Sequence, residues 1–150
     1  MVRKITPVSR IIKINTEISR IKKAPVARRE RLPEWDETWV PRVDVCEKPG
    51  EVIVEAELPG VAEADIVITV QSSRVEIKGT KMERVSPEKI TYLRLEREFG
   101  GFRRLVALPS TVVPDKARAF LANGVLTLYL KKYLTSEERR RLIESGTEEE

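Results

Sequence analysis

Histidine is absent from this 150-residue chain, and cysteine occurs only once. A chain without histidine lacks the most common general base and metal ligand, which argues against most enzyme classes. The single cysteine, Cys46, excludes an intramolecular disulfide and a cysteine-based zinc site. No apolar run approaches the roughly 18 residues of a membrane-spanning helix. We therefore expect a cytoplasmic protein with no catalytic residues, no cofactor, no metal and no membrane span.

Charge is abundant and unevenly placed. Charged residues make up 35% of the chain, well above the roughly 25% of an ordinary soluble protein. Residues 1–31 carry ten basic and two acidic side chains, a net charge of +8, so the rest of the chain sums to −4. This arm contains no aromatic side chain on which a nucleic-acid base would stack, so we expect no nucleic-acid partner.

The basic arm shows a helical pattern. Thr6-Pro7 is typical of a helix start, with Thr6 as the N-cap, and Ala24-Pro25 marks the end. Isoleucines recur between them at intervals of three, four and three, which predicts an amphipathic helix. They are Ile11, Ile14, Ile18 and Ile21. Three roles remain open for this helix: packing on its own domain or on a second copy, capturing other proteins, or binding a membrane surface or nucleic acid.

From residue 43 onward, apolar residues alternate with polar ones, and this period of two predicts β-strands. The strongest signal is Asn123-Gly124, because both central residues of a type I′ hairpin turn need a positive φ. Alternating segments occur at 43–46, 52–58, 66–70, 75–77, 92–97, 102–108, 117–122 and 126–131. No helical pattern intervenes, so the predicted fold is all-β, an antiparallel sandwich.

Two further features complete the predicted organisation. Thr135 and Glu138 form a capping-box pattern, which predicts a short helix to about Glu144, followed by a disordered acidic end. Trp35 and Trp39 are expected to hold the preceding linker against the first strand. We therefore predict an N-terminal arm and linker over residues 1–38, one domain over 39–132 and a C-terminal extension over 133–150.

Several motifs, in order and at matching spacing over about residues 39–132, resemble the small heat-shock protein family, which is built on an α-crystallin domain. The most specific is A-x-x-x-N-G-V-L. The motifs are Trp39–Val45 (WVPRVDV), Leu58–Val61 (LPGV), Leu95–Arg97 with Gly100 and Phe102–Pro109, and Ala119–Leu126. The resemblance implies an immunoglobulin-like antiparallel β-sandwich that binds unfolding proteins without nucleotide hydrolysis.

The resemblance also implies how two copies associate. Residues 92–97 predict a strand that is charged on one face, which fits a sheet edge or another subunit better than its own core. In bacterial and plant-type relatives the matching strand pairs with the partner subunit, beside the strand that matches residues 42–46, and Arg104 falls at a dimer-interface arginine. The implied dimer interface is Tyr92, Leu93, Arg94, Leu95, Glu96, Arg97, Arg104, Val43 and Val45.

In such domains two edge strands, here matching 66–70 and 117–122, border a groove that accepts I-x-I segments or client chains. The groove candidates are Ile66, Ile68, Val70, Ala119 and Leu121, to which the arm adds Ile11, Ile14, Ile18 and Ile21. The alternative is that the strand residues simply face the sandwich core. The family's C-terminal I-x-I motif is missing after Lys132, and Ile12-Lys13-Ile14 has the spacing to replace it.

We therefore expect an ATP-independent chaperone, a holdase, that keeps destabilised proteins from aggregating and assembles as a homodimer or larger oligomer. The alternative is an adaptor sandwich, like the CS-domain co-chaperones, that acts on a partner chaperone. The A-x-x-x-N-G-V-L motif and the charged 92–97 segment favour the holdase.

Overall fold

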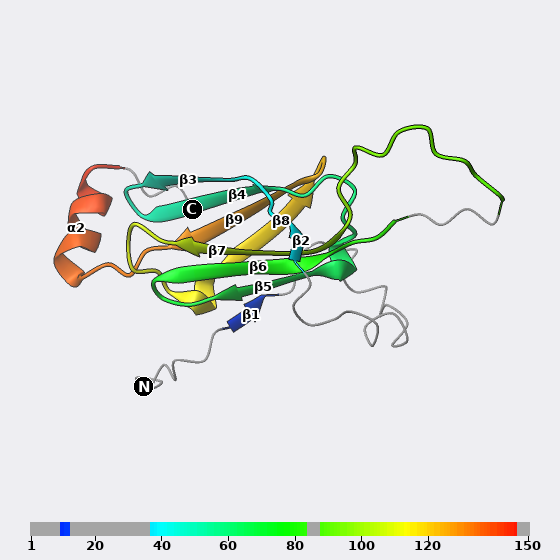
Figure 1. Cartoon of the computed structure of the whole chain (residues 1–150). Coiled ribbons are helices and arrows are strands. Elements are labelled where there is room, and N and C mark those ends of the chain that lie inside the picture. The colour runs from blue at the N-terminus through cyan, green and yellow to red at the C-terminus, as the bar shows by residue number, and fades with distance from the viewer. Residues whose placement is uncertain (1–9, 13–36, 84–87, 147–150) are drawn as a thin grey trace.

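The computed structural model describes residues 10–12, 37–83 and 88–146 (Figure 1). Its strands are β1 (Arg10–Ile12), β2 (Glu37–Trp39), β3 (Val43–Lys48), β4 (Glu51–Glu57), β5 (Ile66–Val70), β6 (Arg74–Lys81), β7 (Gly100–Ala107), β8 (Arg118–Ala122) and β9 (Val125–Lys131). Short 3₁₀ turns, η2 (Glu63–Asp65) and η3 (Pro114–Lys116), precede β5 and β8, and the helix α2 (Ser136–Glu144) follows β9.

The strands form two sheets that face each other (Figure 1). One sheet has the order β1-β5-β6-β7-β2 and the other has the order β3-β4-β9-β8. All pairings are antiparallel except that of β2 with β7, which is parallel. The predicted antiparallel sandwich is confirmed.

The core follows from the alternation of the sequence. On β4 and just beyond it, Val52, Val54, Ala56 and Leu58 have no exposed surface, whereas Glu55 and Glu57 between them face solvent. On β9 the leucines at 126, 128 and 130 are likewise fully buried. Because successive side chains of a strand point to opposite faces, each strand places its aliphatic residues between the sheets. The core is aliphatic apart from Trp39 and Phe102.

The β8–β9 hairpin has the predicted turn. Asn123 and Gly124 both have positive φ angles, 52° and 76°. The turn also contacts the strand beside it: the Leu58 amide donates to the Gly124 carbonyl at 2.7 Å, and a Cβ at Gly124 would lie 3.0 Å from Pro59 Cα. Glycine is therefore required at this position both by conformation and by space.

Trp39 anchors the start of the domain, but not at the predicted place. Its ring packs against Phe102 with 4.9 Å between ring centroids, and its Nε1 donates to the Gly100 carbonyl at 3.1 Å. The prediction that Trp39 holds the linker against the first strand of the domain, β3, is wrong. Trp39 lies on β2, which pairs with β7, and β7 supplies both an aromatic residue for its ring and a carbonyl for its polar N–H. Trp35 lies outside the described residues.

Two predicted elements differ from the structure. Residues 92–97 form no strand in the described chain, because no neighbouring strand is available to pair with them. Residues 10–12 form β1, paired with β5 in the register Ile11–Thr69, where a helix was predicted. These residues pair with the edge of a sheet and do not form the predicted helix, because isoleucine also has a high strand propensity. Ile14, Ile18 and Ile21 lie outside the described residues.

The C-terminal helix is confirmed with its predicted cap. The Thr135 hydroxyl accepts from the Glu138 amide, and the Glu138 carboxylate accepts from the Thr135 amide at 2.8 Å, which completes a capping box. The division into residues 1–38, 39–132 and 133–150 stays a prediction; β2 spans the first of these boundaries.

Candidate functional site: open strand edges and an unpaired charged segment

The segment 92–97, which we call the free segment, projects away from the sandwich within the connection between β6 and β7 (Figure 1). Every one of its residues is exposed, and Leu93 and Leu95 expose 96% and 69% of their surface. Arg94 and Glu96 form an ion pair at 3.6 Å that is itself solvated. Two exposed leucines on an unpaired, extended segment are the features of a strand that lacks its sheet.

The free segment is tied down where it returns to the sandwich. The Phe99 carbonyl accepts a hydrogen bond from the Thr38 hydroxyl, and the Phe99 ring contacts two cations. Arg97 lies 4.8 Å from the ring centroid and Lys81 lies 5.7 Å from it. Cation–π contacts of this kind stabilise by roughly 0.5–1 kcal/mol at exposed sites. These contacts therefore hold the C-terminal end of the free segment on the sandwich.

Strand β3 offers an open edge of the second sheet. In that sheet β3 pairs only with β4, so its other side has no partner among the described residues. Val43 packs against the core, whereas Val45 is 41% exposed and Cys46 is an exposed free thiol. A shallow hollow runs along this edge, lined by Val45–Glu47 and by residues 107–109. An added strand would find both unpaired backbone groups and apolar surface here.

Arg104 is an inward-facing charge. It lies opposite Ile77 in the β6–β7 register, and Ile77 is fully buried, so the Arg104 side chain starts from the core side of the sheet. It is half-buried, and no carboxylate of the described residues pairs with it. A partly desolvated guanidinium without a counter-charge is unfavourable, so this position favours a carboxylate supplied from elsewhere.

The predicted groove residues lie in the core. Ile66, Ile68, Val70 and Ala119 are buried, and Leu121 is partly buried against the core. Their side chains therefore face the sandwich interior, which was the alternative interpretation of these residues. A client contact by these side chains stays a prediction.

The large apolar residues that β5 and β8 do expose are Val67 and Phe120, with 36% and 39% of their surface accessible. Sequence reasoning missed them because it followed the apolar face of each strand. An apolar residue at an outward-facing position of the alternation was the signal that could have identified them.

The two groove strands differ in how their edges are covered. The edge of β8 has no neighbour among the described strands, whereas the edge of β5 is occupied by β1 from the same chain. Phe120 on β8 packs edge-on against Tyr129 at 5.7 Å, and Arg118 lies 5.4 Å from the Tyr129 ring. The β8 edge thus combines free backbone groups with exposed aromatic surface.

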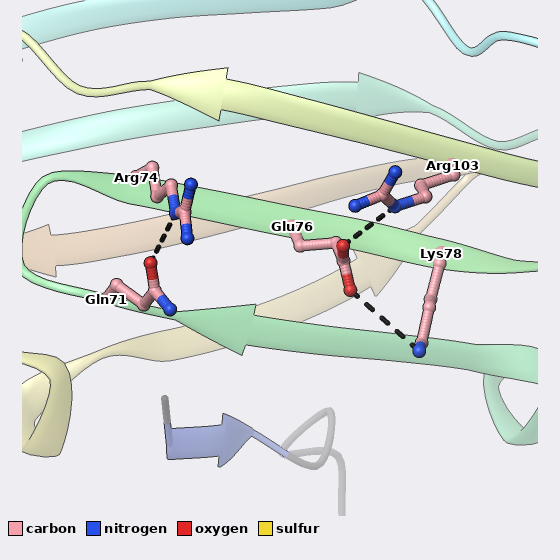
Figure 2. Close-up of polar contacts among 5 residues, drawn as sticks. All are labelled: Gln71, Arg74, Glu76, Lys78 and Arg103. Atoms are coloured by element: carbon pink, nitrogen blue, oxygen red, sulfur yellow. Dashed lines mark hydrogen bonds and ion pairs between the residues drawn. The ribbon is translucent and has the colours of Figure 1, made fainter. Parts of the chain in front are cut away.

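The outer face of the β1-β5-β6-β7-β2 sheet is charged where β6 and β7 pair. Figure 2 shows Glu76 between two cations, with Arg103 Nε at 2.8 Å and Lys78 Nζ at 3.9 Å. Lys78 and Arg103 are directly opposite in the register of β6 and β7, so Glu76 offsets their mutual repulsion. Arg74 adds a hydrogen bond to Gln71 (Figure 2). We interpret this face as a solvated, structural one.

Two carboxylates, Glu47 and Glu138, have lowered pKa values with structural causes. A hydrogen bond from Lys132, with a second from Ser110, lowers the pKa of Glu47. A backbone hydrogen bond from Thr135, with one from its hydroxyl, lowers the pKa of Glu138. Both carboxylates are therefore held ionised, the opposite of what a general acid needs. Within the part of the chain that the structure describes, no group of residues is arranged to hold a metal ion, and no helix is long and apolar enough to cross a membrane.

These features define a class of protein: an immunoglobulin-like sandwich that presents strand edges and an unpaired segment. Comparison with known proteins then identifies it. Residues 44–144 match the Hsp20/alpha crystallin family, and the chain belongs to that family. Members of this family, the small heat-shock proteins, are stress chaperones and not enzymes.

Curated relatives include the spore protein SP21 of Stigmatella aurantiaca, 39% identical over 112 residues, which covers 74% of this chain and 66% of the relative. The small heat shock protein C2 of Rickettsia felis is 32% identical over 101 residues, 67% of this chain and 66% of the relative. The chain thus matches just under two thirds of the length of these relatives.

Solved structures agree. A small heat-shock protein from Xylella fastidiosa is 35% identical with a TM-score of 0.58, over 65% of this chain and 90% of that one. Heat shock protein 16.0 from Schizosaccharomyces pombe is 30% identical with a TM-score of 0.58, over 65% and 91%.

Proposed function

We propose that the protein is an ATP-independent holdase that binds partly unfolded proteins through its strand edges and acts as a homodimer or larger oligomer. The observation that carries this proposal is the pairing of β1 with the edge of β5. A segment from far along the chain adds to the sheet as an extra strand. Because the pairing uses backbone groups, it makes little demand on the sequence of the segment that is bound.

The two edges have complementary roles in this proposal. The β5 edge is occupied by the chain's own residues 10–12 and becomes available when β1 is displaced. The β8 edge has no neighbour among the described strands and carries Phe120. Exposed apolar segments of a client gain roughly 25 cal/mol per Å² of apolar surface that they bury, and several weak contacts per oligomer add through multivalency. Ile11, Ile14, Ile18 and Ile21 of the arm are the predicted further contacts.

Dimerisation by strand exchange is the second part of the proposal. The free segment of one subunit pairs with β3 of its partner, where Val43 and Val45 provide apolar surface. The geometry that supports it is threefold: a segment without a sheet, an edge without a neighbour, and Arg104 without a counter-charge among the described residues. The relative from Xylella fastidiosa is described as having a distinct high-order structure, which is in keeping with self-association. The exposed thiol of Cys46 on the β3 edge fits a reducing compartment, the cytoplasm.

Heat-induced light scattering of a heat-labile client enzyme, without ATP, tests the holdase function. Stoichiometric amounts of this protein are expected to suppress the scattering, and undiminished scattering at excess would overturn the proposal. The variants Val67→Asp and Phe120→Asp place a charge on the exposed positions of the two edge strands and are expected to weaken suppression severalfold. Leu105→Asp is the matched control, because Leu105 is an exposed apolar residue on β7, which has neighbours on both sides.

A further inference from the structure

A hollow of about 640 Å³ lies at the end of the sandwich that α2 occupies (Figure 1). Three parts of the chain line it: the β3–β4 turn, the end of β9 with the residues that follow, and α2 with Gly146 beyond it. Val113 and Lys116 complete its wall. We call this hollow the end pocket. Its volume is in the range of pockets that hold small molecules.

Backbone hydrogen bonds fix the sandwich side of the end pocket. The Lys132 amide donates to the Gly50 carbonyl at 3.0 Å, which joins the end of β9 to the β3–β4 turn. The Val113 amide donates to the Lys131 carbonyl at 2.9 Å, and the Lys116 amide donates to the Val113 carbonyl at 3.0 Å. The strands and the 3₁₀ turn that line the pocket are therefore held in place relative to one another by the fold itself.

The remaining wall, α2, packs only lightly on the sandwich. None of its residues is buried, and Leu142 is its one half-buried residue. The Leu142 Cδ1 atom lies 3.8 Å from the place that a Cβ on Gly50 would take, so this contact is with the β3–β4 turn. Most of the stability of a helix in a protein comes from the apolar face that it packs on its neighbours. A helix with so little of it is open to further stabilisation by its charged side chains.

The carboxylates at the end pocket are already engaged. Glu51 is the one acidic residue among the described residues of the lining, and its carboxylate contacts Arg118 at 3.5 Å. Glu47, which precedes the lining residue Lys48, pairs with Lys132 at 2.6 Å. Neither carboxylate is left to neutralise a further cation of the pocket.

Four further cations line the end pocket, and none of them has an ion-pair partner among the described residues. They are Lys48 of β3, Lys116 of η3, Lys131 of β9 and Arg139 of α2. Residues 32–150 sum to a net charge of −4, so this positive cluster stands out on an acidic body. Cations gathered around one hollow create a positive potential that attracts an anion.

We propose that the end pocket binds a small polyanion with clustered phosphate groups. A phosphate group carries a charge of up to about −2 and three acceptor oxygens, so a compact oligophosphate supplies enough charge for four cations in one hollow. Arg139 offers it a guanidinium fork, and the three lysines offer ammonium donors. Because Arg139 lies on α2 and the lysines lie on the sandwich, the bound ligand bridges the two and holds α2 in place. This inference is independent of the holdase function and of strand exchange.

Calorimetric titration of the full chain with inorganic tripolyphosphate tests the proposal. One ion is expected to bind per chain, and orthophosphate is expected to bind about tenfold more weakly, because a single group reaches fewer of the cations. Equal affinities for the two ions would overturn the proposal. Phytate, which carries its phosphates on an organic ring, distinguishes the source of the ligand. Tighter binding of phytate supports a phosphorylated metabolite, and tighter binding of tripolyphosphate supports a free oligophosphate.

Two double variants locate the binding. Lys116→Gln/Lys131→Gln removes two cations of the pocket and is expected to lower the affinity about tenfold, as for the loss of two exposed charge contacts. Lys89→Gln/Arg140→Gln removes the same charge from exposed positions outside the lining and is expected to leave the affinity unchanged. Equal affinities in the two variants would mean that the ligand binds elsewhere, for instance to the basic arm of residues 1–31, and would overturn the proposal.

Hydrogen exchange reads the bridge between α2 and the sandwich. Tripolyphosphate is expected to slow exchange of the α2 amides severalfold in the wild-type protein and in Arg140→Gln, but not in Arg139→Gln. Arg140 is the matched control, because it is the next residue of α2, is also exposed and does not line the pocket. Binding that leaves α2 exchange unchanged in the wild-type protein contradicts a site formed by α2 and the sandwich together.

Discussion

Strand β9 and the free segment share the same sequence pattern and have opposite surroundings. On β9 the leucines at 126, 128 and 130 are fully buried, because β4 and β8 flank the strand and the other sheet covers it. In the free segment Leu93 and Leu95 alternate with charged residues, and both are exposed, Leu93 almost wholly. Alternation thus specifies what a strand would bury, whereas burial itself requires a neighbour. The neighbour of β9 is in the chain, and we propose that the neighbour of 92–97 is a second copy.

The comparison is most severely tested by removing one leucine from each region. Leu128→Ala leaves a cavity in a packed interior and is expected to lower the free energy of unfolding by about 2–5 kcal/mol. Leu93→Ala removes a side chain that buries nothing within its own subunit and is expected to change that subunit's stability by less than about 0.5 kcal/mol. Urea unfolding at low protein concentration measures both. Comparable losses would show that residue 93 is packed within its own subunit.

A double substitution in the free segment tests whether its partner is another copy. Leu93→Asp/Leu95→Asp places two charges where the proposed dimer buries apolar surface, and it is expected to halve the native mass while the far-UV circular dichroism stays unchanged. Analytical ultracentrifugation measures the mass. Val67→Asp, on an exposed β5 position, is the control and is expected to keep the dimer. A wild-type protein that sediments as a strict monomer would favour the adaptor alternative.

Two of the glycines with left-handed backbones, Gly124 and Gly146, sharpen the contrast between a packed and an open site. Gly124→Ala is expected to cost about 1–2 kcal/mol for the conformation alone, and the contact with Pro59 adds to this cost. Gly146 has a similar φ of +68° but no atom near its Cβ position, so Gly146→Ala carries only the conformational part. Chemical denaturation of both variants should rank Gly124→Ala as the more damaging. The reverse order would contradict the packing of the β8–β9 turn on Pro59.

The smallest expected effect concerns pH at the α2 cap. The pKa of Glu138 is lower in the folded protein than its ordinary value, because the Thr135 amide and hydroxyl donate to its carboxylate. The cap therefore stabilises the helix fully above the ordinary carboxyl pKa, and this contribution is lost as pH falls through the lowered one. The amide resonance of Thr135 should follow that transition in an NMR titration. Thr135→Ala removes the hydroxyl but keeps the amide, so it is expected to weaken the helix by about 0.5–2 kcal/mol and to reduce the transition. Glu138→Gln has no carboxyl that titrates and should abolish the transition.

The sequence alone determined the elements whose partners lie close along the chain. The Asn123-Gly124 turn, the alternation on β4, β5 and β9, and the Thr135–Glu138 cap each depend on local geometry, and each is present as predicted. The alternating segments without intervening helices predicted the antiparallel sandwich, and the family resemblance added its immunoglobulin-like type. Local patterns of this kind are decided by φ, ψ and side-chain period, which are properties of neighbouring residues.

Only the tertiary structure decided which edges are covered and which residues lie exposed beside them. It paired residues 10–12 with β5, seated Trp39 on β7, buried the predicted groove residues and left Val67 and Phe120 outside. It also brought Lys48, Lys116, Lys131 and Arg139, from strands, a 3₁₀ turn and α2, around one hollow. The physical reason is that strand pairing and burial are contacts between distant segments. The free energy of such a contact depends on which partner is available, and no single segment carries that information.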